Sequence, residues 1–223
     1  MGEVNYKRTG RIVGILYIIG TVSGVLSASF LGMRNSADYL MEIGNNPVPL
    51  QLGAVLVMMM GFSLALIPAF MFPILKKHSA PSAVGYVIFR GALETCTYII
   101  RAICYLALAS LGVAHVADGM QNVDSLGTLL NNVGSLPITV FVFGIGALIF
   151  YIALYKYRLI PRWISIVGLV AILLHIASGV LVLLGLQEDF DTASIIMNMP
   201  IALQEMVMAV YLIVKGFRVV DER

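Results

Sequence analysis

Six long apolar stretches follow one another along the chain, and the short segments between them hold most of its charged and turn-forming residues. Each stretch has about 18 to 25 residues, enough for an α-helix to cross the hydrocarbon core of a bilayer. The pattern predicts an all-α fold, a polytopic membrane bundle of six transmembrane helices. It forms a single domain over residues 1–223, with spans near 11–31, 52–75, 83–107, 138–155, 163–184 and 200–217.

The composition supports this interpretation. Hydrophobic residues make up 60% of the chain and charged residues only 12%, whereas soluble domains have about 45–50% and 25%. The first apolar stretch is longer than the core of a secretory signal, so we interpret it as a membrane helix. The expected surroundings are therefore a lipid bilayer. A net charge of +2 is too small to indicate a nucleic-acid partner.

Basic residues predict the orientation of the helices. They gather before the first helix, between the second and third, between the fourth and fifth, and after the sixth. The residues are Lys7, Arg8, Arg11, Lys76, Lys77, Lys156, Arg158, Arg162, Lys215, Arg218 and Arg223. The other three loops contain Arg34 as their single Lys or Arg. Because Lys and Arg near helix ends stay on the cytoplasmic side, we expect both termini in the cytoplasm.

Four charged residues lie inside the predicted spans. Arg90, Glu94 and Arg101 lie on the third helix, and Glu205 lies on the sixth. Each costs about 2.5–3.5 kcal/mol at the bilayer centre unless it finds a partner or a wet cavity. Arg90 and Glu94 are four residues apart and share a helical face, which predicts an ion pair between them. The third helix should therefore lie inside the bundle.

A second ion pair is predicted between Arg101 and Glu205, with Gln204 as an additional polar group. Their distances from the predicted outer helix ends place Arg101 and Glu205 at similar heights. His175 lies in the middle of the fifth helix, and Ser178 follows on the same face. A histidine there either hydrogen-bonds within the packed bundle or takes up a proton.

These polar residues form the candidate site: Arg90, Glu94, Arg101, His175, Gln204 and Glu205. The sequence indicates no catalytic residue, because the motifs of metalloproteases, nucleotide-binding loops and α/β-hydrolases are absent. No metal site is expected either, since His78 and His115 belong to opposite membrane surfaces. No cofactor is predicted.

A ridge of small residues on the first helix, Gly20, Gly24 and Ala28, allows another helix to approach closely. That helix belongs either to the same chain or to another subunit. The ridge therefore predicts a contact surface that could serve a second copy or a membrane partner.

Several segments together resemble the bacterial family of membrane proteins called domain of unknown function 4386. They are the basic lead from Lys7 to Tyr17, Phe89-Arg90 followed by Glu94, the segment 159–163, and Pro200 with Glu205 and the segment 211–216. The resemblance extends over nearly the whole chain. It implies a six-helix bacterial protein of the inner cell membrane with no assigned activity, and no catalytic residues carry over from it.

Two main functions are compatible with the sequence. The leading hypothesis is a membrane protein with a charged cavity built by the third, fifth and sixth helices, which acts as a transporter of a small solute or as a proton-coupled transporter. The alternative is a non-catalytic bundle that binds or regulates another membrane protein, with its ion pairs fixing the packing. An intramembrane enzyme is a third class, and it would need a water path to Glu94, Glu205 or His175.

Overall fold

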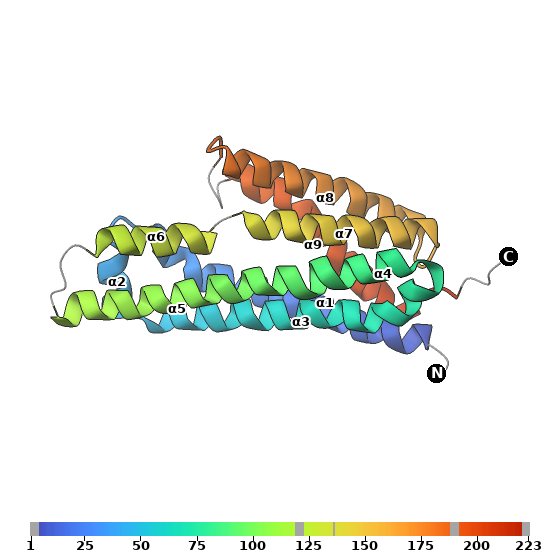
Figure 1. Ribbon diagram of the computed structural model, residues 1–223, viewed down its shortest axis with the longest axis horizontal. Helices are drawn as coiled ribbons and strands as arrows, with labels where there is room; N and C mark the ends of the chain where they lie inside the picture. The colour runs from blue at the N-terminus through green and yellow to red at the C-terminus, as the bar shows by residue number, and fades with distance from the viewer. Residues whose placement is uncertain (1–4, 119–122, 136, 188–191, 220–223) are drawn as a thin grey trace.

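The computed structural model describes residues 5–118, 123–135, 137–187 and 192–219, and these ranges contain helices and no strand (Figure 1). The predicted all-α fold is confirmed. The elements are α1 (Tyr6–Leu31), the 3₁₀ turn η1 (Gly32–Asn35), α2 (Tyr39–Asn45), α3 (Val48–His78), α4 (Ala80–Tyr86), the π-helix η2 (Val87–Leu93), α5 (Glu94–Asp118), α6 (Asp124–Ser135), α7 (Ile138–Lys156), α8 (Arg162–Leu183) and α9 (Thr192–Lys215).

Six helical runs of the described chain are long and apolar enough to cross a membrane. They contain α1, α3, the continuous helix α4–η2–α5, α7, α8 and α9. The predicted number of spans is therefore confirmed. Large apolar side chains remain exposed on the outer surface, for example Val25 on α1, Ile103 on α5 and Leu203 on α9. Such faces are stable against lipid and would be costly in water.

Two helices extend furthest beyond the spans expected from the sequence. α9 begins at Thr192, eight residues before the predicted start, and runs through Pro200. Its polar residues Ser194 and Asn198 are accommodated because they hydrogen-bond toward α8. α5 continues to Asp118 because its second half is covered by α2 and α6.

The six spans form a closed ring around a common interior. α1 packs between α3 and α9, and α3 packs against the long helix α4–η2–α5. This helix contacts α7, α7 contacts α8, and α8 contacts α9. The beginning of α1 and the end of α9 meet at one end of the bundle, where the backbone N–H of Phe217 donates to the carbonyl of Tyr6 at 3.3 Å. α2 and α6 lie at the opposite end (Figure 1).

The small-residue ridge on α1 is used within the chain. A Cβ atom at Gly20 would lie 2.7 Å from Cδ2 of Leu64, and one at Gly24 would lie 2.7 Å from Sδ of Met60. Both glycines therefore let α1 approach α3 closely. Ala28 is exposed, and a contact of this ridge with a second copy or a membrane partner stays a prediction.

Candidate binding cavity

The third span changes its helical winding at the site. The π-helix Val87–Leu93 separates α4 from α5, and Arg90 is its middle residue. π-helical turns are rare and are found frequently at functional sites. A Cβ atom at Gly91 would meet Pro68 of α3 at an ordinary 3.7 Å, so the π-helix packs directly on the proline-containing part of α3.

The Arg90 guanidinium holds two carboxylates from different helices. Nη1 donates to both oxygens of Glu94 at 3.1 Å, and Nη2 donates to Oε1 of Glu205 at 3.3 Å. The predicted pair of Arg90 and Glu94 is thus confirmed. The guanidinium carbon also lies 4.5 Å from the ring centre of Phe143, a favourable position for a cation. Arg90, Glu94 and Glu205 therefore form one buried cluster, in which a single cation pairs with two carboxylates.

The two carboxylates differ in their surroundings. Glu94 is fully buried and also accepts a hydrogen bond of 3.1 Å from the hydroxyl of Tyr98. The Glu205 side chain is 12% exposed, lines a cavity, and has Arg90 as its hydrogen-bond partner within the described residues. Glu94 therefore has two hydrogen-bond partners in the core, whereas Glu205 is held by Arg90 and borders the cavity.

The predicted contact between Arg101 and Glu205 is wrong. Arg90 lies ten residues after the start of α4, and Glu205 lies ten residues before the end of α9, so both are about 15 Å from the same end of the bundle. Arg101 is about 16 Å further along its helix, where its Nη2 donates to the hydroxyl of Tyr105 at 3.3 Å. The error arose because α9 begins earlier than expected, which places Glu205 deeper in the bundle.

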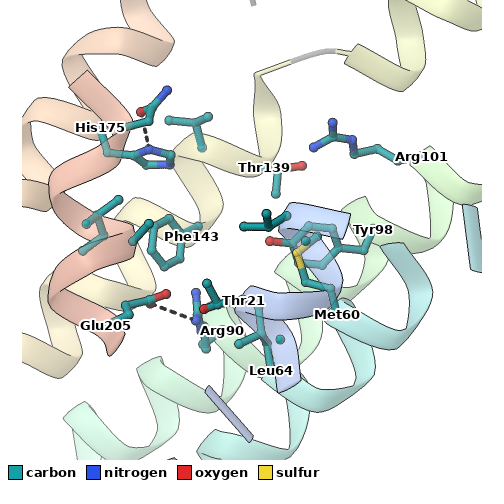
Figure 2. Close-up of a pocket in the computed structure, with 17 residues that line it drawn as sticks. Thr21, Met60, Leu64, Arg90, Tyr98, Arg101, Thr139, Phe143, His175 and Glu205 are labelled. Carbon is teal, nitrogen blue, oxygen red and sulfur yellow. Dashed lines mark hydrogen bonds and ion pairs between the residues drawn. The ribbon is translucent and has the colours of Figure 1, made fainter. Parts of the chain in front are cut away.

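A cavity of ≈ 310 Å³ lies beside the cluster and is lined by residues from all six spans (Figure 2). It extends from the level of Arg90 and Glu205 toward the end of the bundle away from the termini, since its wall also contains Thr139 near the start of α7. Most of the wall is apolar. Glu205 and Arg101 lie at well separated parts of this wall in Figure 2.

His175 lines this cavity, and its hydrogen bonds define which ring nitrogen carries the hydrogen. Its Nδ1 lies 2.6 Å from Oδ1 of Asn198, and the amide nitrogen of Asn198 donates to Ser194 and Ser178. This network assigns the Asn198 oxygen as an acceptor, so Nδ1 carries the hydrogen when the ring is neutral. His175 lines the cavity with Nε2 as an acceptor (Figure 2).

Gln204 belongs to a different part of the core. Its side-chain oxygen accepts from the hydroxyl of Tyr151, and its nitrogen donates to the carbonyl of Ile164 at 3.0 Å. Gln204 is the neighbour of Glu205 in sequence, so it points about 100° away on the helix. The site therefore brings together Arg90, Glu94, Glu205 and His175, with Arg101 at a distance and Gln204 outside the cavity.

Sequence reasoning missed four residues of the site: Tyr98, Thr139, Phe143 and Asn198. Asn198 carries a usable signal, since it precedes Glu205 by two helical turns and shares its face. The Thr139 hydroxyl is buried, and the described residues give it no hydrogen-bond partner. In the described ranges, no group of three or more His, Cys, Asp and Glu side chains could hold a metal ion.

The comparisons with known proteins identify the family. The model of the family described as "Domain of unknown function (DUF4386)" matches residues 12–216. The chain belongs to the DUF4386 family. The resemblance noted from its segments is thereby confirmed, and membership assigns no activity to the DUF4386 chain. No curated protein and no solved structure matches it.

The cavity of this DUF4386 protein offers acid–base and binding chemistry. Glu205 and His175 are acceptors at a wall shared by all six helices, and the neighbouring Arg90 can pair with either carboxylate. A proton or a polar solute that enters the cavity would change the hydrogen-bond partners of Glu205. Because Glu205 lies on α9 and Arg90 on the long third span, this change would alter the contact between the two helices.

Proposed function

We propose that the protein moves a small solute across the membrane in a cycle coupled to a proton, and that Glu205 carries the proton. The observation that carries the proposal is the sharing of one guanidinium by two carboxylates beside a cavity lined by every span. With all three groups ionised, the cluster has one excess negative charge. Such a charge is costly in the low-dielectric interior, so a proton or a cation should neutralise it.

Glu205 rather than Glu94 is the exchangeable acid. Glu94 receives hydrogen bonds from Arg90 and from Tyr98 and is fully buried. Glu205 borders the cavity and is held by Arg90 from across the helix interface. Protonation of Glu205 would leave Arg90 and Glu94 as a neutral pair. It would also weaken the contact between α9 and the third span. Protonation would in this way change how the two helices pack.

We propose that the chain lies in the bacterial cell membrane with both termini in the cytoplasm. The supporting observation is the gathering of Lys7, Lys77, Lys156 and Lys215 at or near the helix ends where α1 begins and α9 ends. Basic residues favour the cytoplasmic side. In this orientation the cavity extends from Arg90 and Glu205 toward the outer end of the bundle.

The test uses the purified protein in liposomes that contain a pH-sensitive dye. Small cationic, neutral and anionic solutes are added outside, and the internal pH is followed. We expect at least one solute class to drive proton movement with the native protein, and the Glu205→Gln variant to behave like empty liposomes. Glu42→Gln, the same change at an exposed residue of α2, should behave as the native protein does.

Two results would contradict the proposal. One is a native protein that moves no protons with any of the three classes. The other is a Glu205→Gln variant that moves them at the native rate.

Glu94→Gln should also be inactive, because Glu205 then becomes the sole counterion of Arg90 and must stay ionised.

A further inference from the structure

We propose, on the basis of the function above, that the solute is a small organic monocation with N–H donors, exchanged one for one with the proton on Glu205. The chemical class is a protonated amine, a guanidinium or an amidinium. The inference rests on the acceptors that face the cavity, on the charge of the buried cluster and on the character of the remaining wall.

Two acceptors face the cavity beside its apolar wall. Glu205 uses Oε1 to accept from Arg90, and within the described residues Oε2 has no hydrogen-bond partner. His175 uses Nδ1 on Asn198, which leaves Nε2 as an acceptor for the cavity. Both residues line the same space (Figure 2). A ligand that satisfies both must donate hydrogen bonds, as an ammonium or guanidinium group does.

The charge of the cluster favours a solute with a single positive charge. Arg90 and Glu94 form a neutral pair through two hydrogen bonds of 3.1 Å, so Glu205 contributes one negative charge of its own. A proton or a monocation restores neutrality. A dication would leave one excess positive charge, and an anion would add to the negative charge, and both are costly in this medium.

The other charged and titratable groups near Glu205 do not alter this count. From each helix around it they are Tyr17 on α1, Tyr86 on α4, Tyr151 on α7 and His175 on α8. The tyrosines are neutral, and His175 hydrogen-bonds through Nδ1 to Asn198. Arg101 lines the far part of the cavity, about 16 Å further along its helix than Arg90, and its Nη2 donates to the hydroxyl of Tyr105.

The wall limits the size of the solute. A volume of ≈ 310 Å³ lies at the lower end of the range for small-molecule sites. Phe143 fills the space between Arg90 and His175, with its ring 4.5 Å from the guanidinium carbon and 5.1 Å from the imidazole centre. Ile201 and Leu64 complete an apolar surface that suits a short hydrocarbon group beside the cationic head.

The experiment uses three probes of nearly equal size in liposomes with an internal pH dye. Methylguanidinium is a fixed monocation with N–H donors, methylurea is its neutral analogue, and methanesulfonate is an anion. A guanidinium stays charged at every working pH, so methylguanidinium cannot cross the bilayer as a free base and the pH change reports the protein. Potassium and valinomycin set the membrane potential.

We expect external methylguanidinium to make the interior alkaline with the native protein, at a rate that does not depend on the imposed potential. Methylurea and methanesulfonate should have no effect. Glu205→Gln should give the rate of empty liposomes, and Glu42→Gln the native rate. His175→Phe removes one acceptor and should raise the concentration for half-maximal rate about tenfold, as expected for a lost hydrogen bond to a charged group.

Each contrary outcome has a distinct meaning. Proton movement driven by methanesulfonate or methylurea alone would overturn the cation class and leave proton-coupled transport standing. A rate that depends on the potential would overturn the one-for-one exchange. No movement with any probe would overturn both proposals. If Glu205→Gln is not monodisperse in detergent, Ala202→Leu replaces it, since it narrows the cavity at a lining residue and should likewise suppress the methylguanidinium response.

Discussion

Replacement of Arg90 by methionine is the sharpest test of the buried cluster. Arg90 is 2% exposed and donates three hydrogen bonds to Glu94 and Glu205. Methionine keeps an unbranched side chain of similar length but leaves both carboxylates without their cation. Removing one partner of a buried ion pair costs about 3–5 kcal/mol. Protonation of the two acids relieves part of the loss, so we expect the free energy of unfolding to fall by about 4 kcal/mol.

The assay is unfolding in mixed micelles by increasing the fraction of a denaturing detergent, followed by circular dichroism and extrapolated linearly. Arg11→Met, at an exposed position of α1, should change the free energy of unfolding by less than about 0.5 kcal/mol. The triple variant Arg90→Met, Glu94→Gln, Glu205→Gln should recover most of the loss. A cost below about 1 kcal/mol for Arg90→Met, or a triple variant no more stable than it, would show that Arg90 does not stabilise the two buried carboxylates.

Further predictions concern helix packing and orientation. Gly10→Ala should lower the free energy of unfolding by about 1–3 kcal/mol, because the new Cβ would lie 2.7 Å from the Gly216 backbone. Gly32→Ala, which meets nothing within 4 Å, serves as its control in the same micelle assay, and equal costs would contradict the packing. Single cysteines at Glu42 and Lys156, in a cysteine-free chain, should react with an impermeant maleimide from the outside and from the cytoplasmic side respectively. Labelling of both from one side would contradict the proposed orientation.

The lengths of the apolar stretches predicted most of the fold. Apolar length alone predicts six spans, because a bilayer requires about 20 apolar residues for each crossing. The pair of Arg90 and Glu94 followed from local helical geometry, in which residues four apart are neighbours. Both inferences depend on short-range rules that hold whatever the rest of the chain does, and both are confirmed.

Contacts between helices were harder to predict. The partner of Glu205 depends on its depth, which depends on where α9 begins, and polar residues such as Asn198 concealed that start. The π-helix around Arg90 has no signal in a pattern of apolar positions. Phe143 and Thr139 are ordinary residues for a membrane span, and their place in the cavity wall comes from the packing of the whole ring.

Infrared difference spectroscopy can show whether Glu205 is the acid that takes up a proton in the bundle. Lowering the pH of the purified protein should produce the carbonyl band of a buried protonated carboxylic acid. We expect this band to be retained in Glu42→Gln and to be absent from Glu205→Gln over the pH range in which the native protein shows it. A band of undiminished size in Glu205→Gln would show that another acid takes up the proton.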